Sequence, residues 1–107
     1  MKLYGLKNCD TCRKALKSLA GAGHAVDFID VRADGVAPTD LQRFWNAFGD
    51  KLLNTRSTTW RGLDDGARAQ DPMKLLADHP TLMKRPVIDH DGSLTLGWTK
   101  DAQSQFL

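Results

Sequence analysis

The two cysteines of the chain, Cys9 and Cys12, form a C-x-x-C pattern. They follow a short apolar run that ends at Gly5, and a helical pattern begins at Asp10. The unpaired N–H groups and the positive dipole end of a helix N-terminus favour an anion, so a cysteine in the capping position ionises more easily than a free thiol. Cys9 is therefore predicted to be the nucleophile and to have the lower pKa of the pair.

Cys12 lies one turn into the predicted helix, where its sulfur can attack a mixed disulfide formed on Cys9 and release the reduced partner. This spacing at a helix N-terminus can bring the two Cα atoms within bridging distance, so we expect oxidation to give a Cys9–Cys12 disulfide. Cys12 is thus the predicted resolving thiol. A packing role is the alternative for Cys12, because it falls on the apolar face of the helix.

A zinc site is another use of a C-x-x-C pair. Structural zinc requires four ligands, and the chain has no second pair of this kind. The three histidines, His24, His79 and His90, are scattered and do not show the spacing of zinc ligands. We therefore predict no metal site.

The composition is that of an ordinary globular protein, with 41% hydrophobic and 26% charged residues in 107 positions, and a single domain is expected. The sequence contains no apolar run of membrane-spanning length and no signal sequence, so a cytoplasmic protein is expected. In a reducing cytosol, a close cysteine pair is typical of catalytic or redox-sensing sites. The net charge of +2 gives no argument for nucleic acid or membrane partners.

The elements that hold the cysteines are predicted to form a β-α-β unit. A strand is expected at Lys2–Gly5, a helix from about Asp10 to Ala20, and a second strand at His24–Val31. Such a unit has parallel strands and a right-handed connection. The apolar face of the helix is formed by Cys12, Ala15, Leu16, Leu19 and Ala20.

A helical insertion is predicted over about 36–82. Helical periodicity runs from Pro38 to Gly49, and Asp71–Pro72 opens a further short helix. The polar and basic stretch Asn54–Arg61 lies between these helices.

The end of the chain is predicted to contain a hairpin and a helix. Strands are expected at Arg85–Asp89 and Ser93–Gly97, because Asp91–Gly92 is a hairpin turn signal, and a helix follows at Thr99–Phe106. The complete order, β-α-β, helical insertion, β-β-α, predicts an α/β fold with a mixed four-stranded sheet flanked by helices.

A cysteine motif after the first strand and a proline that opens the third strand make this frame thioredoxin-like. In such a frame, Pro86 would lie opposite the C-x-x-C pair. The Arg85–Pro86 peptide bond can be cis or trans, and the sequence leaves that choice open.

The chain resembles the arsenate reductase (ArsC) family, on the YffB side that also includes Spx-type regulators. Three stretches in family order carry the resemblance: Tyr4–Ala15, Leu53–Arg61 and His79–Ile88. It covers nearly the whole chain and implies a thioredoxin-like fold with a helical insertion. It also implies an oxyanion-binding loop with a nucleophilic cysteine, matched by Cys9, and three arginines.

Two departures from the family pattern bear on the substrate. Glutaredoxin-coupled arsenate reductases commonly lack a cysteine at the position of Cys12. Of the three arginine positions, only Arg85 matches in register, since the first falls on Asn54 with Arg56 nearby and the third falls near Gly97–Trp98. Each guanidinium group binds the oxygens of arsenate bidentately, so the loss of one or two of the three arginines is expected to give poor arsenate reduction.

Two hypotheses follow from the residues and the resemblance. The first is a monomeric thiol-dependent reductase with no bound cofactor, using glutathione or a small disulfide as substrate and glutaredoxin or thioredoxin as alternative partners. The second is an Spx-type regulator whose disulfide switches binding to RNA polymerase; the shorter chain favours the first. The predicted substrate or glutathione ligands are Lys7, Asn8, Asp10, Thr11, Arg13, Arg56, Arg85 and Pro86. Trp60 and Trp98 are further candidates to flank the site, with a packing role as the alternative for each.

Overall fold

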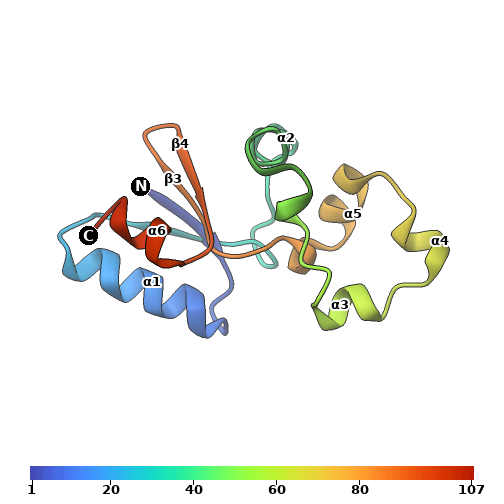
Figure 1. Cartoon of the computed structure of the whole chain (residues 1–107), viewed down its shortest axis with the longest axis horizontal. Coiled ribbons are helices and arrows are strands. Elements are labelled where there is room, and N and C mark those ends of the chain that lie inside the picture. Colours follow the sequence, from blue (N-terminus) through green and yellow to red (C-terminus); the bar gives the residue numbers. More distant parts are fainter. The chain divides into compact units, whose positions relative to one another are not determined.

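The structure, a computed structural model, describes all residues from Met1 to Leu107 and divides into two compact units. The first unit combines Met1–Asp34 with Arg85–Leu107, and the second is Gly35–Lys84, which covers nearly the range predicted for the helical insertion. Figure 1 labels the main elements. In chain order they are β1 (Lys2–Gly5), α1 (Asp10–Gly21), β2 (Asp27–Asp30), α2 (Pro38–Phe48), η1 (Gly49–Leu52), α3 (Thr58–Arg61), α4 (Asp65–Arg68), α5 (Pro72–Asp78), η2 (Pro80–Leu82), β3 (Val87–His90), β4 (Ser93–Leu96) and α6 (Lys100–Ser104).

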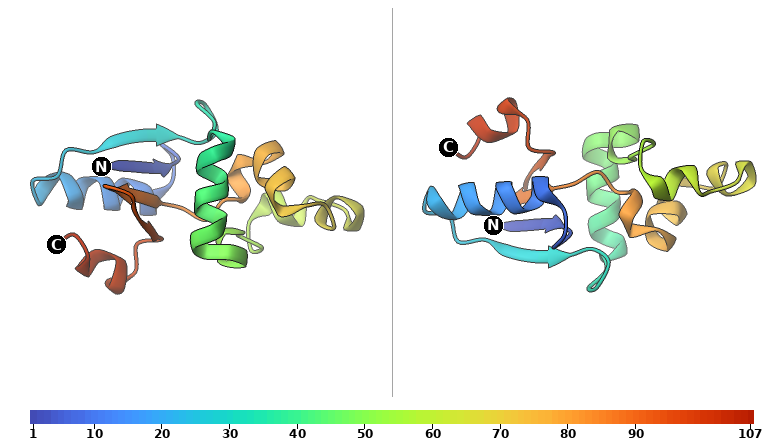
Figure 2. Two further views of the ribbon diagram at one scale, coloured as in Figure 1. Left: turned by 90° about the horizontal axis from the view of Figure 1, so that it is seen from above. Right: turned by 90° about the horizontal axis from the view of Figure 1, so that it is seen from below.

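The first unit is built on a mixed sheet of four strands in the order β2-β1-β3-β4. Strand β1 pairs in parallel with β2 and antiparallel with β3, and β3 forms a hairpin with β4. Helix α1 lies against one face of this sheet (Figure 2). The order of elements and the mixed sheet agree with the frame predicted from the sequence.

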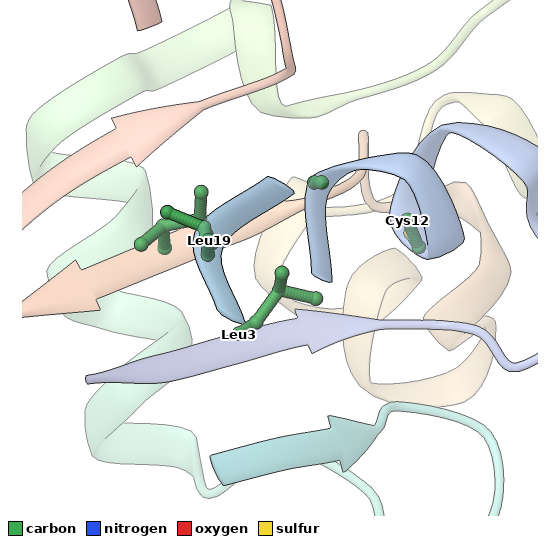
Figure 3. Close-up of a cluster of buried hydrophobic side chains, with 5 residues drawn as sticks. Leu3, Cys12 and Leu19 are labelled. Carbon is green, nitrogen blue, oxygen red and sulfur yellow. The ribbon is translucent and has the colours of Figure 1, made fainter. Parts of the chain in front are cut away.

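The core of this unit lies between α1 and the sheet. Its fully buried members are Leu3, Cys12, Ala15, Leu19 and Ile88, three of which are labelled in Figure 3. Trp98 and Phe106 of the C-terminal segment pack against the same cluster. The assignment of Ala20 to the buried face is wrong, because Ala20 is exposed. At 100° per residue, Ala20 is turned about 80° from Cys12 and lies at the edge of the stripe.

Strand β2 is shorter than the predicted span His24–Val31. It covers only Asp27–Asp30, and each of its residues pairs with one of the four residues of β1. Strand β1 is too short to pair with a longer strand. At its end, the Asp30 carboxylate accepts hydrogen bonds from the N–H groups of Arg32 (2.9 Å) and Ala33 (3.0 Å). This side-chain turn ends the strand.

The hairpin turn at Asp91–Gly92 is confirmed. Asp91 and Gly92 have φ values of 53° and 87°, and two positive values are the mark of the type I′ turn that suits a hairpin. The Arg85–Pro86 peptide bond is cis.

The second unit is helical. Its longest helices, α2 and α5, begin with prolines as predicted and bury leucine and phenylalanine side chains. The short helices α3 and α4 were not predicted, because four residues show no apolar periodicity. Each begins with a capping side chain, Ser57 for α3 and Asp64 for α4. In neither unit does a helix have the length and apolar character needed to cross a membrane.

Candidate active site

Cys9 is the N-cap residue of α1. Its backbone is extended (φ −90°, ψ 118°), and its carbonyl oxygen accepts the N–H of Arg13 at 3.0 Å. The N–H of Cys9 donates to the carbonyl oxygen of Leu6 at 3.2 Å and closes the turn after β1. These two bonds hold the half-buried Cys9 at the N-terminus of the helix, where the sequence predicted it.

The thiolate of Cys9 is stabilised by its neighbours in the first unit. Partial burial alone would raise the pKa of Cys9, but the N–H and the thiol of Cys12, together with the charged guanidinium of Arg85, lower it by more. The pKa of Cys9 is therefore lowered from its ordinary value. No capping hydrogen bond of normal geometry links the Cys9 side chain to α1, so the influence of the Cys12 N–H is mainly electrostatic.

Cys12 has the opposite character. It is completely buried in the cluster between α1 and the sheet, and burial is the main reason why its pKa rises to about 11. Its hydrogen bond to Cys9 and the charge of that thiolate raise the pKa further, whereas the N–H of Leu6 and the charge of Arg85 lower it. At neutral pH, Cys12 is thus a protonated thiol that donates a hydrogen bond to the Cys9 thiolate. Both cysteines are free thiols in the structure.

The cation that acts on Cys9 is Arg85. Arg13 and Asp10 were also predicted as substrate or glutathione ligands. In the structure, the exposed side chains of Arg13 and Asp10 form an ion pair with each other. Arg85, which the family resemblance placed among the predicted ligands, comes from the segment just before β3, far from the cysteines along the chain. No local sequence pattern predicts its effect on the Cys9 thiolate.

Pro86 lies next to the turn that follows β4. Its carbonyl oxygen accepts the N–H of Gly97 at 2.8 Å. Gly97 has a φ of 79°, which favours glycine, and Trp98 packs against the core of the first unit. The segment beside Pro86, where the family pattern has its third arginine, therefore carries a glycine and a packed tryptophan.

The loop that leads into α1 is exposed on its polar side. The predicted ligands there are all open to solvent: Lys7, Asn8, Asp10, Thr11 and Arg13. Lys7 and Arg13 border a hollow of about 270 Å³ that also touches Leu16 and Phe28. This hollow offers an apolar floor beside two cations.

The carboxylate of Asp30 at the end of β2 is tied to the same loop. Its pKa is lowered mainly by the N–H of Ala33, with further contributions from the N–H of Arg32 and from the charge and N–H of Lys7. Asp30 therefore helps to hold the Lys7 end of the loop that carries Cys9.

Three predicted residues have other surroundings. Arg56 belongs to the second unit and is exposed, and its backbone N–H donates a hydrogen bond to the side-chain oxygen of Asn54 at 3.2 Å. Trp60, also in the second unit, lies under the guanidinium of Arg68 at 5.6 Å. Trp98 stacks on Phe106, with ring centroids 6.5 Å apart, as expected of a packing residue.

The backbone of Gly5 and Leu6 is a part of the site that was not predicted from the sequence. The Leu6 N–H donates to the sulfur of Cys12, and Gly5 lies directly against that sulfur. The one available signal was that a glycine ends an otherwise apolar strand immediately before the cysteine loop. No three side chains of His, Cys, Asp or Glu gather in an arrangement that could hold a metal ion.

Comparison with known proteins identifies the family. The model of the ArsC family matches residues 4–106. The chain belongs to the ArsC family. This ArsC-family protein is 42% identical over 110 residues to an uncharacterised protein of Haemophilus influenzae, covering 97% of this chain and 96% of the relative.

Two further similarities connect this ArsC-family protein to the subgroups named above. A solved structure of a YffB protein superposes with a TM-score of 0.87 at 35% identity, covering 99% of this chain and 97% of that one. The global transcriptional regulator Spx of Staphylococcus epidermidis is 34% identical over 113 residues, covering 98% of this chain and 85% of the regulator. The predicted thioredoxin-like α/β fold and the predicted family are confirmed by these matches.

Proposed function

We propose that this ArsC-family protein is a thiol-disulfide reductase that attacks its substrate with Cys9 and uses glutathione as co-substrate. The observation that carries the proposal is that the protein shifts the pKa values of the two thiols in opposite directions. The pKa of Cys9 is lowered, whereas that of Cys12 is raised to about 11. A thiolate is the nucleophile in disulfide exchange, so the two cysteines have different roles.

In the first step, the Cys9 thiolate attacks one sulfur of a disulfide. A bond forms between Cys9 and that sulfur, the substrate S–S bond breaks, and the second sulfur leaves as a thiolate that takes a proton from water. The product is a mixed disulfide on Cys9.

In the second step, Cys12 loses its proton to water and attacks the sulfur of Cys9. The bond to the substrate breaks, the second thiol is released, and a Cys9–Cys12 disulfide remains. The substrate has gained two electrons and the protein has lost two. Two glutathione molecules then reduce the protein disulfide and leave as glutathione disulfide.

Ionisation of Cys12 is easier in the mixed disulfide than in the resting protein. Once Cys9 carries the substrate, its negative charge and its hydrogen bond no longer raise the pKa of Cys12. The charge of Arg85, which lowers that pKa, remains. The resolving thiol is thus kept inactive until the first step has occurred, although burial still slows its reaction.

The charges near Cys9 favour glutathione over arsenate. Arsenate requires several guanidinium groups, each binding its oxygens through two N–H groups, to replace its hydration. Of the arginines, Arg85 acts on Cys9, and Gly97 occupies the segment beside Pro86. The reacting sulfur of a mixed disulfide between glutathione and another thiol is neutral, and the carboxylates of its glutathione part lie some distance from the reacting atoms. Exposed Lys7 and Arg13, at the hollow beside the loop, suit such carboxylates.

The test compares both reactions in one buffer while backbone amide shifts follow the binding of each ligand. We expect glutathione to shift amides near Cys9 and Pro86. We expect glutathione-linked disulfide reduction to exceed arsenate reduction by at least about tenfold, which corresponds to one lost charged contact of ~1.5 kcal/mol. The Cys9→Ser variant is the control and should lose both activities. Arsenate turnover equal to or above disulfide turnover would contradict the substrate assignment.

The proposal also covers partners and location. Glutaredoxin or thioredoxin is the alternative electron donor, and the protein is proposed to act as a cytoplasmic monomer. Sedimentation of the reduced protein at micromolar concentration tests the monomer, and a donor-replacement assay with each partner tests the electron source.

A second candidate function is redox-controlled binding to RNA polymerase. It is supported by the 34% identity to an Spx regulator across 98% of this chain. A pull-down with purified RNA polymerase, using the reduced and the oxidised protein, distinguishes the two functions. Retention that depends on the redox state, without glutathione-linked turnover, would favour the regulator.

A further inference from the structure

Gly5 lies directly against the sulfur of Cys12. A Cβ atom built on Gly5 would be 2.6 Å from Cys12 Sγ, 3.2 Å from Cys12 Cβ and 3.2 Å from a methyl group of Leu3. The first distance is shorter than Cβ atoms adopt in proteins, so any side chain at this position requires a neighbour to move. Gly5 is also buried, at the end of β1.

Space, and not backbone conformation, requires glycine at this position. The φ angle of Gly5 is not positive, in contrast to those of Gly23, Gly92 and Gly97. Other residues could therefore adopt its backbone angles. What they could not provide is the room that the Cys12 sulfur occupies.

The sulfur of Cys12 is held on several sides in this space. Cys12 belongs to the first turn of α1 and is fully buried with Leu3 in the core cluster (Figure 3). The N–H of Leu6, the residue after Gly5, donates a hydrogen bond to the sulfur, and the Cys12 thiol donates one to Cys9. The end of β1 thus supplies both the room and one hydrogen bond for this thiol.

We propose that Gly5 is a positioning residue for the cysteine pair: its missing side chain forms the recess that keeps the Cys12 sulfur buried and directed at Cys9. A methyl group at position 5 would push the sulfur out of the recess. The hydrogen bond from Cys12 to the Cys9 thiolate would weaken, and Cys12 would become accessible to reagents. The inference rests on the proposed function for its catalytic meaning, but its test does not measure turnover.

The first test uses Gly5→Ala, with Gly21→Ala as the matched control. Gly21 lies at the end of α1, is exposed, and has no atom within 4 Å of a built Cβ. In Gly5→Ala, the thiolate absorbance of Cys9 should titrate at higher pH than in the wild type, and in Gly21→Ala it should not change. A purely structural role of Gly5 would not move this titration.

The second measurement is the accessibility of Cys12, made in the Cys9→Ser background so that only one thiol reacts. Adding Gly5→Ala should increase the rate of Cys12 alkylation in the folded protein by at least about tenfold, equivalent to ~1.4 kcal/mol of exposure free energy. An unchanged Cys9 titration together with an unchanged alkylation rate would overturn the proposal.

A double-mutant comparison keeps the test decisive if Gly5→Ala folds poorly. Cys12→Ala removes the sulfur that the new methyl group would meet. The stability lost through Gly5→Ala should therefore be smaller in the Cys12→Ala background than in the wild type. An equal loss in both backgrounds would show that the contact with the Cys12 sulfur is not the reason for glycine at this position. Neither result depends on whether the protein reduces disulfides, so failure of the reductase assay stays separate.

Discussion

The burial of Cys12 predicts how fast a mixed disulfide on Cys9 is resolved. With a pKa of about 11, roughly one Cys12 thiol in 10⁴ is ionised at pH 7, compared with about one in 30 for a free thiol of pKa ~8.5. The resolution rate follows the ionised fraction, so it should rise nearly tenfold for each pH unit.

The mixed disulfide removes part of this effect. The charge and hydrogen bond of Cys9 are lost when it carries a substrate, but burial, the largest cause, remains. The apparent pKa of resolution should therefore lie between the ordinary value for a thiol and about 11. We expect the steep rise to continue to at least about pH 9.

The assay loads Cys9 with an aromatic thiol from a symmetrical disulfide reagent at low pH, removes the excess, and jumps the pH by rapid mixing. Intramolecular attack by Cys12 releases the coloured aromatic thiolate, so absorbance reports resolution alone. The Cys12→Ser variant is the control and should hold its mixed disulfide. A rate that levels off below about pH 8.5 would mean that Cys12 ionises like a free thiol, and the reasoning from its burial would be refuted.

Three further predictions follow from the first unit. Arg85→Met should raise the pKa of the Cys9 thiol, measured by thiolate absorbance, whereas Arg13→Met should change that pKa less because Arg13 pairs with Asp10. Equal pKa shifts in the two variants would contradict this prediction. Between about pH 8.5 and 11, the unfolded chain has lost the Cys12 proton that the native chain keeps, so the free energy of unfolding of the wild type should fall more steeply with pH than that of Cys12→Ala. Urea unfolding at several pH values measures both, and equal slopes of free energy against pH would refute this prediction. Leu19→Ala should cost about 2–5 kcal/mol of unfolding free energy in urea, because Leu19 is fully buried, while the exposed Ala20→Ser should cost far less.

Relations between near neighbours along the chain were predictable from the sequence. The C-x-x-C pair at a strand-to-helix junction located Cys9 at the helix N-cap, because apolar spacing and the glycine before it define both elements. The Asp91–Gly92 turn and the prolines at the starts of α2 and α5 were also recognisable, since each depends on the backbone preference of one or two residues.

Some local predictions failed where the surroundings set the outcome. Strand β2 stops at Asp30 because its partner β1 has only four residues to pair. The β-branched and aromatic residues of His24–Val31 predict a strand, but they do not determine how long the neighbouring strand is. Ala20 is apolar and helical, but its exposure depends on how α1 is rotated against the sheet.

The sequence by itself thus determined which residues can do chemistry, namely a thiol pair at a helix N-terminus, because that follows from residue type and spacing over a few positions. The tertiary structure decided how that pair behaves. It brings Arg85 to Cys9, buries Cys12 against the sheet and leaves room for its sulfur at Gly5. Charge, desolvation and steric contact act through space, and the folded chain sets those distances between residues that the sequence keeps apart.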